Sequence, residues 1–160
     1  MEIIVVGAGI AGLSAGIALR RAGHKVTVRP AYRSQCHSTT LHADKATKIL
    51  EQSGLLQETG AAISIAPNAS PVLRSWGFEV AKSRMVAIKT GSILNGTTMQ
   101  MVVPNYYVNI EENYGVPIYS VHRVDLHDQL KALATGENGP GQPCELQVRA
   151  TVVDYVSDVS

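Results

Sequence analysis

Cysteine is scarce in this sequence, and no block of like charge stands out. Two cysteines, Cys36 and Cys144, lie far apart in 160 residues, so we expect neither a disulfide framework nor a metal-ligand cluster, and a reducing, cytoplasmic location is favoured. The net charge of +1 gives no indication of a nucleic-acid partner or an anionic membrane. Apolar residues make up 45% of the chain, which indicates a globular protein, and the length suits one domain.

The sequence also lacks a recognisable membrane or targeting segment. Residues 3–19 carry no charge, but they follow Glu2 rather than a basic stretch, and Gly7, Gly9 and Gly12 interrupt them. A signal peptide or a membrane-spanning helix would have neither feature. A buried parallel strand followed by a helix explains these residues better, because parallel strands are covered on both faces.

The first thirty residues have the pattern of a βαβ unit. We expect a strand at Glu2–Val6, a glycine turn at Gly7–Gly12, a helix at Ala11–Ala22 that ends near Gly23, and a second strand at Lys25–Val28. The turn has the spacing G-x-G-x-x-G, placed between a strand and a helix. Such a turn binds the pyrophosphate of a dinucleotide at the start of the helix.

Each glycine of the turn has its own expected role. Gly7 permits the tight bend, Gly9 lets a pyrophosphate approach the backbone, and Gly12 lets the helix pack closely on the strand. A carboxylate normally follows the second strand and binds the ribose. Here Arg29 and Pro30 stand in that place. An arginine there is compatible with the 2′-phosphate of NADP, so an NADP-dependent reductase is one alternative.

The remainder of the chain alternates strands and helices. Asn95-Gly96 predicts a two-residue hairpin turn, and residues 85–121 have the pattern of the start of a β-rich region. The expected strands are 63–65, 92–94, 98–103, 117–121 and 146–156, and the expected helices are 44–52, 68–76 and 125–134.

Three segments in the same order resemble the FAD-dependent monooxygenases of the salicylate-hydroxylase type, which are aromatic-ring hydroxylases. They are Val5–Val28, Gly60–Ser70 and Val121–Leu130. The resemblance implies an α/β fold in which a Rossmann-type FAD-binding βαβ unit is followed by the start of a β-rich substrate region. It implies FAD as cofactor, NAD(P)H as reductant, and hydroxylation of an aromatic or related small molecule.

The resemblance also implies roles for individual residues. The glycine turn would hold the FAD pyrophosphate, Ala62 would line the cofactor, and Arg123 would contact it. Two simpler interpretations stay open: Ala62 as a packing residue and Arg123 as an exposed arginine at a strand end. We assign no catalytic residue in this chain, and His122 and His127 receive no catalytic role because no nucleophile or carboxylate partner is evident.

One stretch, Val28–Lys48, has no counterpart in the resemblance. Joining Thr27 directly to Ile49 restores the second strand, and Glu51 then becomes the acid that ends this strand and binds the ribose. Val28-Arg29 can be encoded with a GT start and Lys48 with an AG end, so we hypothesise a retained in-frame intron. The alternative is a genuine surface insertion, which loops tolerate.

The later segments that hold the flavin in this family have no match in the 160 residues. The resemblance therefore implies that residues 1–160 form an incomplete FAD-binding domain, and we expect no hydroxylation by this chain alone. A non-catalytic dinucleotide-binding fragment is the second alternative. The sequence carries no signal for the oligomeric state or for the identity of the substrate.

Overall fold

A computed structural model describes residues 3–24, 47–52, 54 and 61–149. Contacts between residues divide the chain into two compact units. The first comprises Met1–Glu58 together with His127–Ser160, and the second comprises Thr59–Leu126. Each unit is described separately below.

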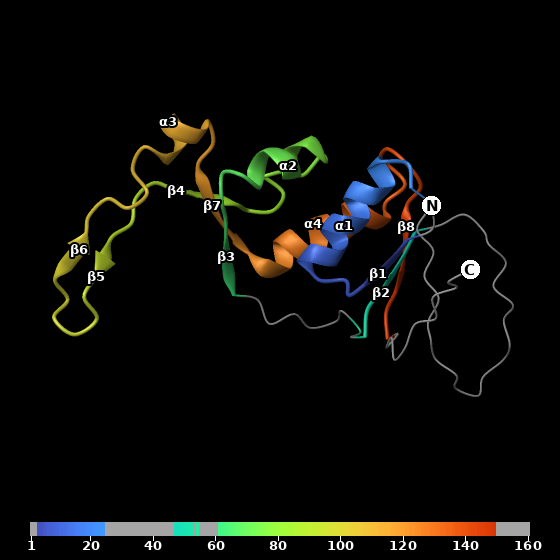
Figure 1. Ribbon diagram of the computed structural model, residues 1–160, viewed down its shortest axis with the longest axis horizontal. Coiled ribbons are helices and arrows are strands. Elements are labelled where there is room, and N and C mark those ends of the chain that lie inside the picture. The colour runs from blue at the N-terminus through green and yellow to red at the C-terminus, as the bar shows by residue number, and fades with distance from the viewer. Residues whose placement is uncertain (1–2, 25–46, 53, 55–60, 150–160) are drawn as a thin grey trace, which may run out of the picture. The chain divides into compact units, whose positions relative to one another are not determined.

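The first unit is built on a parallel sheet with the strand order β1-β2-β8. Strand β1 (Ile4–Val6) leads into helix α1 (Ile10–Arg21), and β2 (Thr47–Leu50) and β8 (Cys144–Gln147) complete the sheet (Figure 1). Val5 pairs with Ile49, which in turn pairs with Leu146. All three strands therefore end at the same edge of the sheet, where parallel α/β sheets bind ligands.

Helix α1 packs closely on this sheet because its inner face contains small residues. A Cβ atom at Gly16 would lie 2.9 Å from Cδ1 of Ile49 and 3.2 Å from Sγ of Cys144. Leu13 and Ile17 on α1 are four residues apart, about one helical turn, and both are buried, as is Ile49. Apolar side chains at this spacing form one stripe of the helix, which explains why the sequence pattern predicts the helix correctly.

The second unit contains an antiparallel sheet with the order β3-β7-β4. The central strand β7 (Ile118–His122) pairs with β3 (Ala62–Ile65) on one side and with β4 (Val86–Ile88) on the other. Helices α2 (Ser70–Ser75) and α3 (Ile110–Tyr114) belong to this unit, and α4 (Arg123–Thr135) begins in it and continues in the first. Its core includes Ile65, Leu73, Phe78, Tyr119 and Val121.

A hairpin of β5 (Ile93–Leu94) and β6 (Met101–Val103) is also part of the second unit (Figure 1). The expected hairpin is present, but the prediction of a two-residue turn at Asn95-Gly96 is wrong. The Asn95 side chain accepts hydrogen bonds from the N–H groups of Thr97 and Thr98, both at 2.9 Å, and the connection extends to Gln100. An asparagine that bonds the backbone ahead of it in this way builds a wider turn.

The structure also differs from the predicted secondary structure in the region before Glu51. The expected helix at residues 44–52 is wrong, because Thr47–Leu50 is strand β2 and pairs on both sides. Pairing with two neighbouring strands overrides the local helical pattern. The expected strand at Lys25–Val28, Arg29, and the greater part of the Val28–Lys48 stretch lie outside the described residues, as do residues 150–156 of the last expected strand. None of the described helices is long and apolar enough to cross a membrane.

Candidate dinucleotide-binding site

The glycine turn joins the end of β1 to the start of α1. Gly7 has a φ of +95°, a backbone conformation that glycine adopts without strain. Gly9 is the residue before the helix, and its carbonyl accepts the first helical hydrogen bond, from the N–H of Leu13 at 3.0 Å. Among residues 3–24, 47–52, 54 and 61–149, no side chain caps this end of α1. The N–H groups of the first turn therefore point outward in the way that suits a phosphate.

The two other glycines differ in what surrounds them. A Cβ atom at Gly12 would overlap the carbonyl oxygen of Gly7 and would lie 3.4 Å from a side-chain methyl of Val5. Gly12 is thus required mainly by the turn itself and only secondarily by packing of helix on strand. A Cβ atom at Gly9 would have no atom within 4 Å. The backbone at Gly9 therefore has open space beside it, and no contact in the described part of the protein requires glycine at this position.

Glu51 lies directly beyond β2, beside this turn. Its backbone N–H donates to the carbonyl of Gln147 at 2.9 Å, which extends the sheet ladder by one residue. Its side chain accepts a hydrogen bond from the N–H of Ala8 at 2.8 Å. The second parallel strand thus ends with a carboxylate at the glycine turn, where the ribose-binding acid of a Rossmann unit lies.

A buried histidine reaches the same turn from α4. The Nε2 atom of His127 lies 2.7 Å from the carbonyl oxygen of Ala8, and His127 is 3% exposed. No catalytic role was predicted for this residue. The available signal was its position: His127, Leu130 and Ala134 form a buried stripe on one face of α4, which places a polar ring among apolar side chains.

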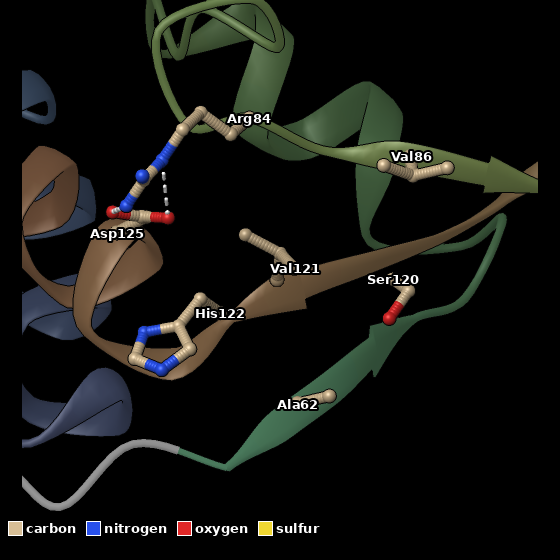
Figure 2. A pocket seen from close by; sticks show the side chains of 7 residues that line it. All are labelled: Ala62, Arg84, Val86, Ser120, Val121, His122 and Asp125. Carbon is tan, nitrogen blue, oxygen red and sulfur yellow. Dashed lines mark hydrogen bonds and ion pairs between the residues drawn. The ribbon is translucent and has the colours of Figure 1, made fainter.

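Ala62 and Arg123 lie in the second unit. Ala62, the first residue of β3, pairs with His122, and the Arg123 N–H donates to the carbonyl of Ala61 at 3.1 Å. Both residues are exposed. An open cavity of about 560 Å³ lies against this end of the sheet. Figure 2 shows the side chains around it, which come from β3, β4, β7, the segment before β4 and the start of α4; they are Ala62, Arg84, Val86, Ser120, Val121, His122 and Asp125.

An ion pair forms one wall of this cavity. Nη2 and Nε of Arg84 donate to the two carboxylate oxygens of Asp125 at 2.6 Å and 3.1 Å (Figure 2). These hydrogen bonds lower the pKa of Asp125 below its ordinary value, and they raise the pKa of Arg84. Such a two-point contact determines the relative orientation of the two side chains in addition to pairing their charges. This pair could not be predicted from the sequence, because the two residues are separated by 41 positions.

The six predicted cofactor residues thus fall into two groups. Gly7, Gly9, Gly12 and Glu51 come together in the first unit, and Ala62 and Arg123 belong to the second. Among the residues that the structure describes, no group of three or more His, Cys, Asp or Glu side chains could hold a metal ion.

Comparisons with known proteins agree with the Rossmann character of the first unit. The family described as FAD binding domain matches residues 2–40. The FAD-dependent monooxygenase phomE′ of Diaporthe leptostromiformis is 57% identical over 107 residues, which cover 67% of this chain and 27% of that protein. The FAD-dependent monooxygenase cfoG of Aspergillus candidus is 33% identical over 156 residues, 97% of this chain and 31% of that protein.

A solved structure that contains FAD has a similar fold. A crystal structure of CtdE in complex with FAD and a substrate superposes with a TM-score of 0.63 at 22% identity, over 93% of this chain and 30% of CtdE. At that identity the likeness concerns the fold alone. The chain spans about a third or less of the length of these relatives. By sequence, residues 1–160 correspond to a part of the FAD-dependent monooxygenases that they match.

Proposed function

We propose that this chain forms the FAD-binding part of a monooxygenase that uses NAD(P)H and O2 to hydroxylate an aromatic or related small molecule. One observation carries the proposal: the uncapped start of α1 and the carboxylate of Glu51 meet at the same glycine turn. The helix start suits the negative charge of a pyrophosphate, and a carboxylate beside it suits ribose hydroxyls.

In this proposal each predicted residue binds a particular part of FAD. The turn of Gly7, Gly9 and Gly12 holds the pyrophosphate, Glu51 accepts hydrogen bonds from the adenosine ribose, and Ala62 and Arg123 line the cofactor. FAD, when bound, supplies the redox chemistry with O2 and NAD(P)H. The residues of the chain bind the cofactor, orient it and limit the access of water to it.

The position of Glu51 favours FAD over NADPH at this turn. A carboxylate that reaches the turn at 2.8 Å would repel the 2′-phosphate of NADPH, whereas the free ribose hydroxyls of FAD can donate to it. NAD(P)H therefore enters the proposal as the reductant and not as the ligand of the glycine turn. A cytoplasmic location, proposed from the scarcity of cysteine, is consistent with these soluble co-substrates.

Replacing Gly9 with valine tests the proposal. The Gly9 backbone has φ −69° and ψ −178°, which valine tolerates, and a Cβ atom there meets nothing within 4 Å. We expect Gly9→Val to fold normally but to lose FAD binding, because its side chain fills the space that the pyrophosphate needs. Titration with FAD, followed by quenching of flavin fluorescence, measures the affinity. Equal affinities of the wild type and Gly9→Val would refute the assignment of the turn.

Gly96→Val is the matched control, since Gly96 also has open space around a Cβ atom but lies in the β5–β6 turn. This variant should bind FAD like the wild type. Arg123→Ala should weaken FAD binding without a loss of stability, because the side chain is exposed. Lys89→Ala, at another exposed cation of the second unit, should leave FAD binding unchanged.

Hydroxylation is proposed for a full-length protein. The matched relatives are three or more times as long as the region that aligns with this chain. For this chain alone we expect FAD binding without an oxygenated product. Mass spectrometry after incubation with FAD, NADH or NADPH, and a panel of phenols and aromatic acids checks this. A product heavier by one oxygen atom, formed only with substrate present, would show that this chain suffices.

A further inference from the structure

The peptide groups on both sides of Ala8 are fixed by side chains from distant parts of the chain. The Ala8 N–H donates to the Glu51 carboxylate at 2.8 Å, and the Ala8 carbonyl accepts from Nε2 of His127 at 2.7 Å. Ala8 itself is 0% exposed. The turn between β1 and α1 is therefore held from the end of β2 on one side and from α4 on the other.

The hydrogen bond from His127 defines the tautomer of its ring. A carbonyl oxygen only accepts hydrogen bonds, so Nε2 must carry the proton. At 3% exposure, water cannot easily replace this donor, and a buried carbonyl that loses its partner is costly. The contact links residues 119 positions apart, so it depends on the packing of α4 and not on the local turn.

We infer that His127 is a positioning residue for dinucleotide binding, which it supports by fixing Ala8 between Glu51 and the first turn of α1. The inference rests on the proposed FAD function of the same turn. In this inference His127 acts through Ala8, whose carbonyl oxygen its Nε2 binds. The carbonyl held by His127 belongs to the peptide that Ala8 shares with Gly9, and this orients the backbone where α1 begins.

The order of the turn should then depend on a donor at position 127. Without it, the Ala8 carbonyl would have to turn toward another donor, and the Ala8 N–H and the Gly9 backbone would move with it. Hydrogen bonds that share neighbouring peptide groups also strengthen one another. Loss of the His127 bond should therefore loosen the contact of Glu51 with Ala8 as well.

The experiment compares three variants of this chain. His127→Leu keeps an apolar side chain in the buried position but removes the donor. His127→Gln keeps an N–H donor at a similar reach. Leu130→Ala, three residues further along the same buried stripe and 0% exposed, opens a cavity in the core but removes no hydrogen-bonding group. Affinities for FAD and for ADP, which shares the pyrophosphate and the adenosine ribose, are measured by calorimetry, with melting temperature and amide hydrogen exchange at residues 7–12.

We expect His127→Leu to bind both FAD and ADP about three- to tenfold more weakly, the effect of losing one hydrogen bond, and to exchange its turn amides faster. His127→Gln should remain within about twofold of the wild type, and Leu130→Ala should melt earlier yet bind normally. Wild-type affinity and protection in His127→Leu would overturn the inference, as would equal weakening by Leu130→Ala. If the wild type binds neither FAD nor ADP, the proposed function fails, and hydrogen exchange alone then decides whether His127 orders the turn.

Discussion

Arg20, on α1, donates a hydrogen bond to the backbone carbonyl of Ala134, near the end of α4, at 3.1 Å. Both residues are almost wholly buried, with exposures of 1% and 0%. The same guanidinium also donates to the carbonyls of Leu133, Gly136, Gly139 and Gly141. Arginine thus satisfies the carbonyls that the last turn of a helix leaves unpaired, and its positive charge suits that helix end.

Replacing Arg20 should therefore be strongly destabilising. In Arg20→Met the buried carbonyls lose their donors, and we expect the free energy of unfolding to fall by about 3 kcal/mol or more. Arg20→Lys should be intermediate, because one ammonium group lacks the planar fork that reaches several acceptors. Urea denaturation measures both. The exposed neighbour Arg21 is the control: Arg21→Met should stay within about 0.5 kcal/mol of the wild type. An equal effect of the two Met variants would show that the Arg20 contacts contribute little.

Gly12 should be the glycine of the turn that folding requires. Gly12→Ala places a Cβ atom against the carbonyl of Gly7, so the turn must shift, at a cost of roughly 1–3 kcal/mol. Gly9→Ala meets open space and should cost much less. Thermal melting of the two variants provides the comparison. Equal melting temperatures would mean that the turn relaxes freely around position 12.

The sequence predicts the elements around this turn because their signals are local. The glycine spacing, the β-branched strand β1 and the apolar stripe of α1 all lie within residues 3–21, and the identity of each residue is sufficient to place it. Glu51 was found from a resemblance combined with the gap at Val28–Lys48. Its contact with Ala8 agrees with that placement, while its role in ribose binding stays a prediction.

Other features depend on partners that are distant in sequence. Strand β2 exists because Thr47–Leu50 pairs with both β1 and β8, and its local sequence looked helical. From the sequence alone, Arg20 would be expected to be a solvated arginine at a helix end. Its carbonyl acceptors at Gly136, Gly139 and Gly141 lie more than 110 positions away and become apparent only in the structure. The same limit applies to His127, whose acceptor lies 119 residues away.

The Arg84–Asp125 pair should make the stability of the second unit depend on acid. Hydrogen bonding to Arg84 lowers the pKa of Asp125 in the folded protein, so unfolding favours proton uptake by this carboxyl. The pair stabilises the fold above the ordinary pKa of aspartate, and this contribution disappears as the pH falls through the lowered folded-state value. Because the Arg84 side chain is 76% exposed, the effect should be modest and sensitive to salt.

Melting curves of Asp125→Asn and the wild type between pH 7 and strong acid test this dependence. The variant should melt earlier than the wild type at neutral pH, and the difference should shrink to nothing in strong acid. Glu79→Gln, in an exposed ion pair with Lys82 three residues further along the chain, is a suitable control and should show a smaller difference. A gap between Asp125→Asn and the wild type that persists in strong acid would show that the aspartate acts through something other than its charge.

Deleting Val28–Lys48 should preserve β2 and stabilise the first unit. In the shortened chain Thr27 precedes Ile49, so Val26 and Thr27 take the places of Thr47 and Lys48, opposite Cys144 and Ile4. Both new residues are β-branched and favour strands. The connection from α1 to β2 becomes four residues long, which is a usual length for such a connection.

The physical gain comes from the shorter loop. Closing a chain of residues 22–46 costs more entropy than closing residues 22–25, and the difference amounts to roughly 1–2 kcal/mol. The deletion variant should therefore show that increase in the free energy of unfolding, with Glu51 still following the strand and FAD affinity equal or better. A variant with residues 28–46 scrambled serves as the control for loop length and should match the wild type.

Lower solubility and weaker FAD binding of the deletion variant would contradict the retained-intron hypothesis, because a segment that the fold uses is not a splicing remnant. Transcripts that contain the segment in every spliced copy would reject that hypothesis directly, and would leave a true surface insertion whose length the protein tolerates at a modest cost in loop entropy.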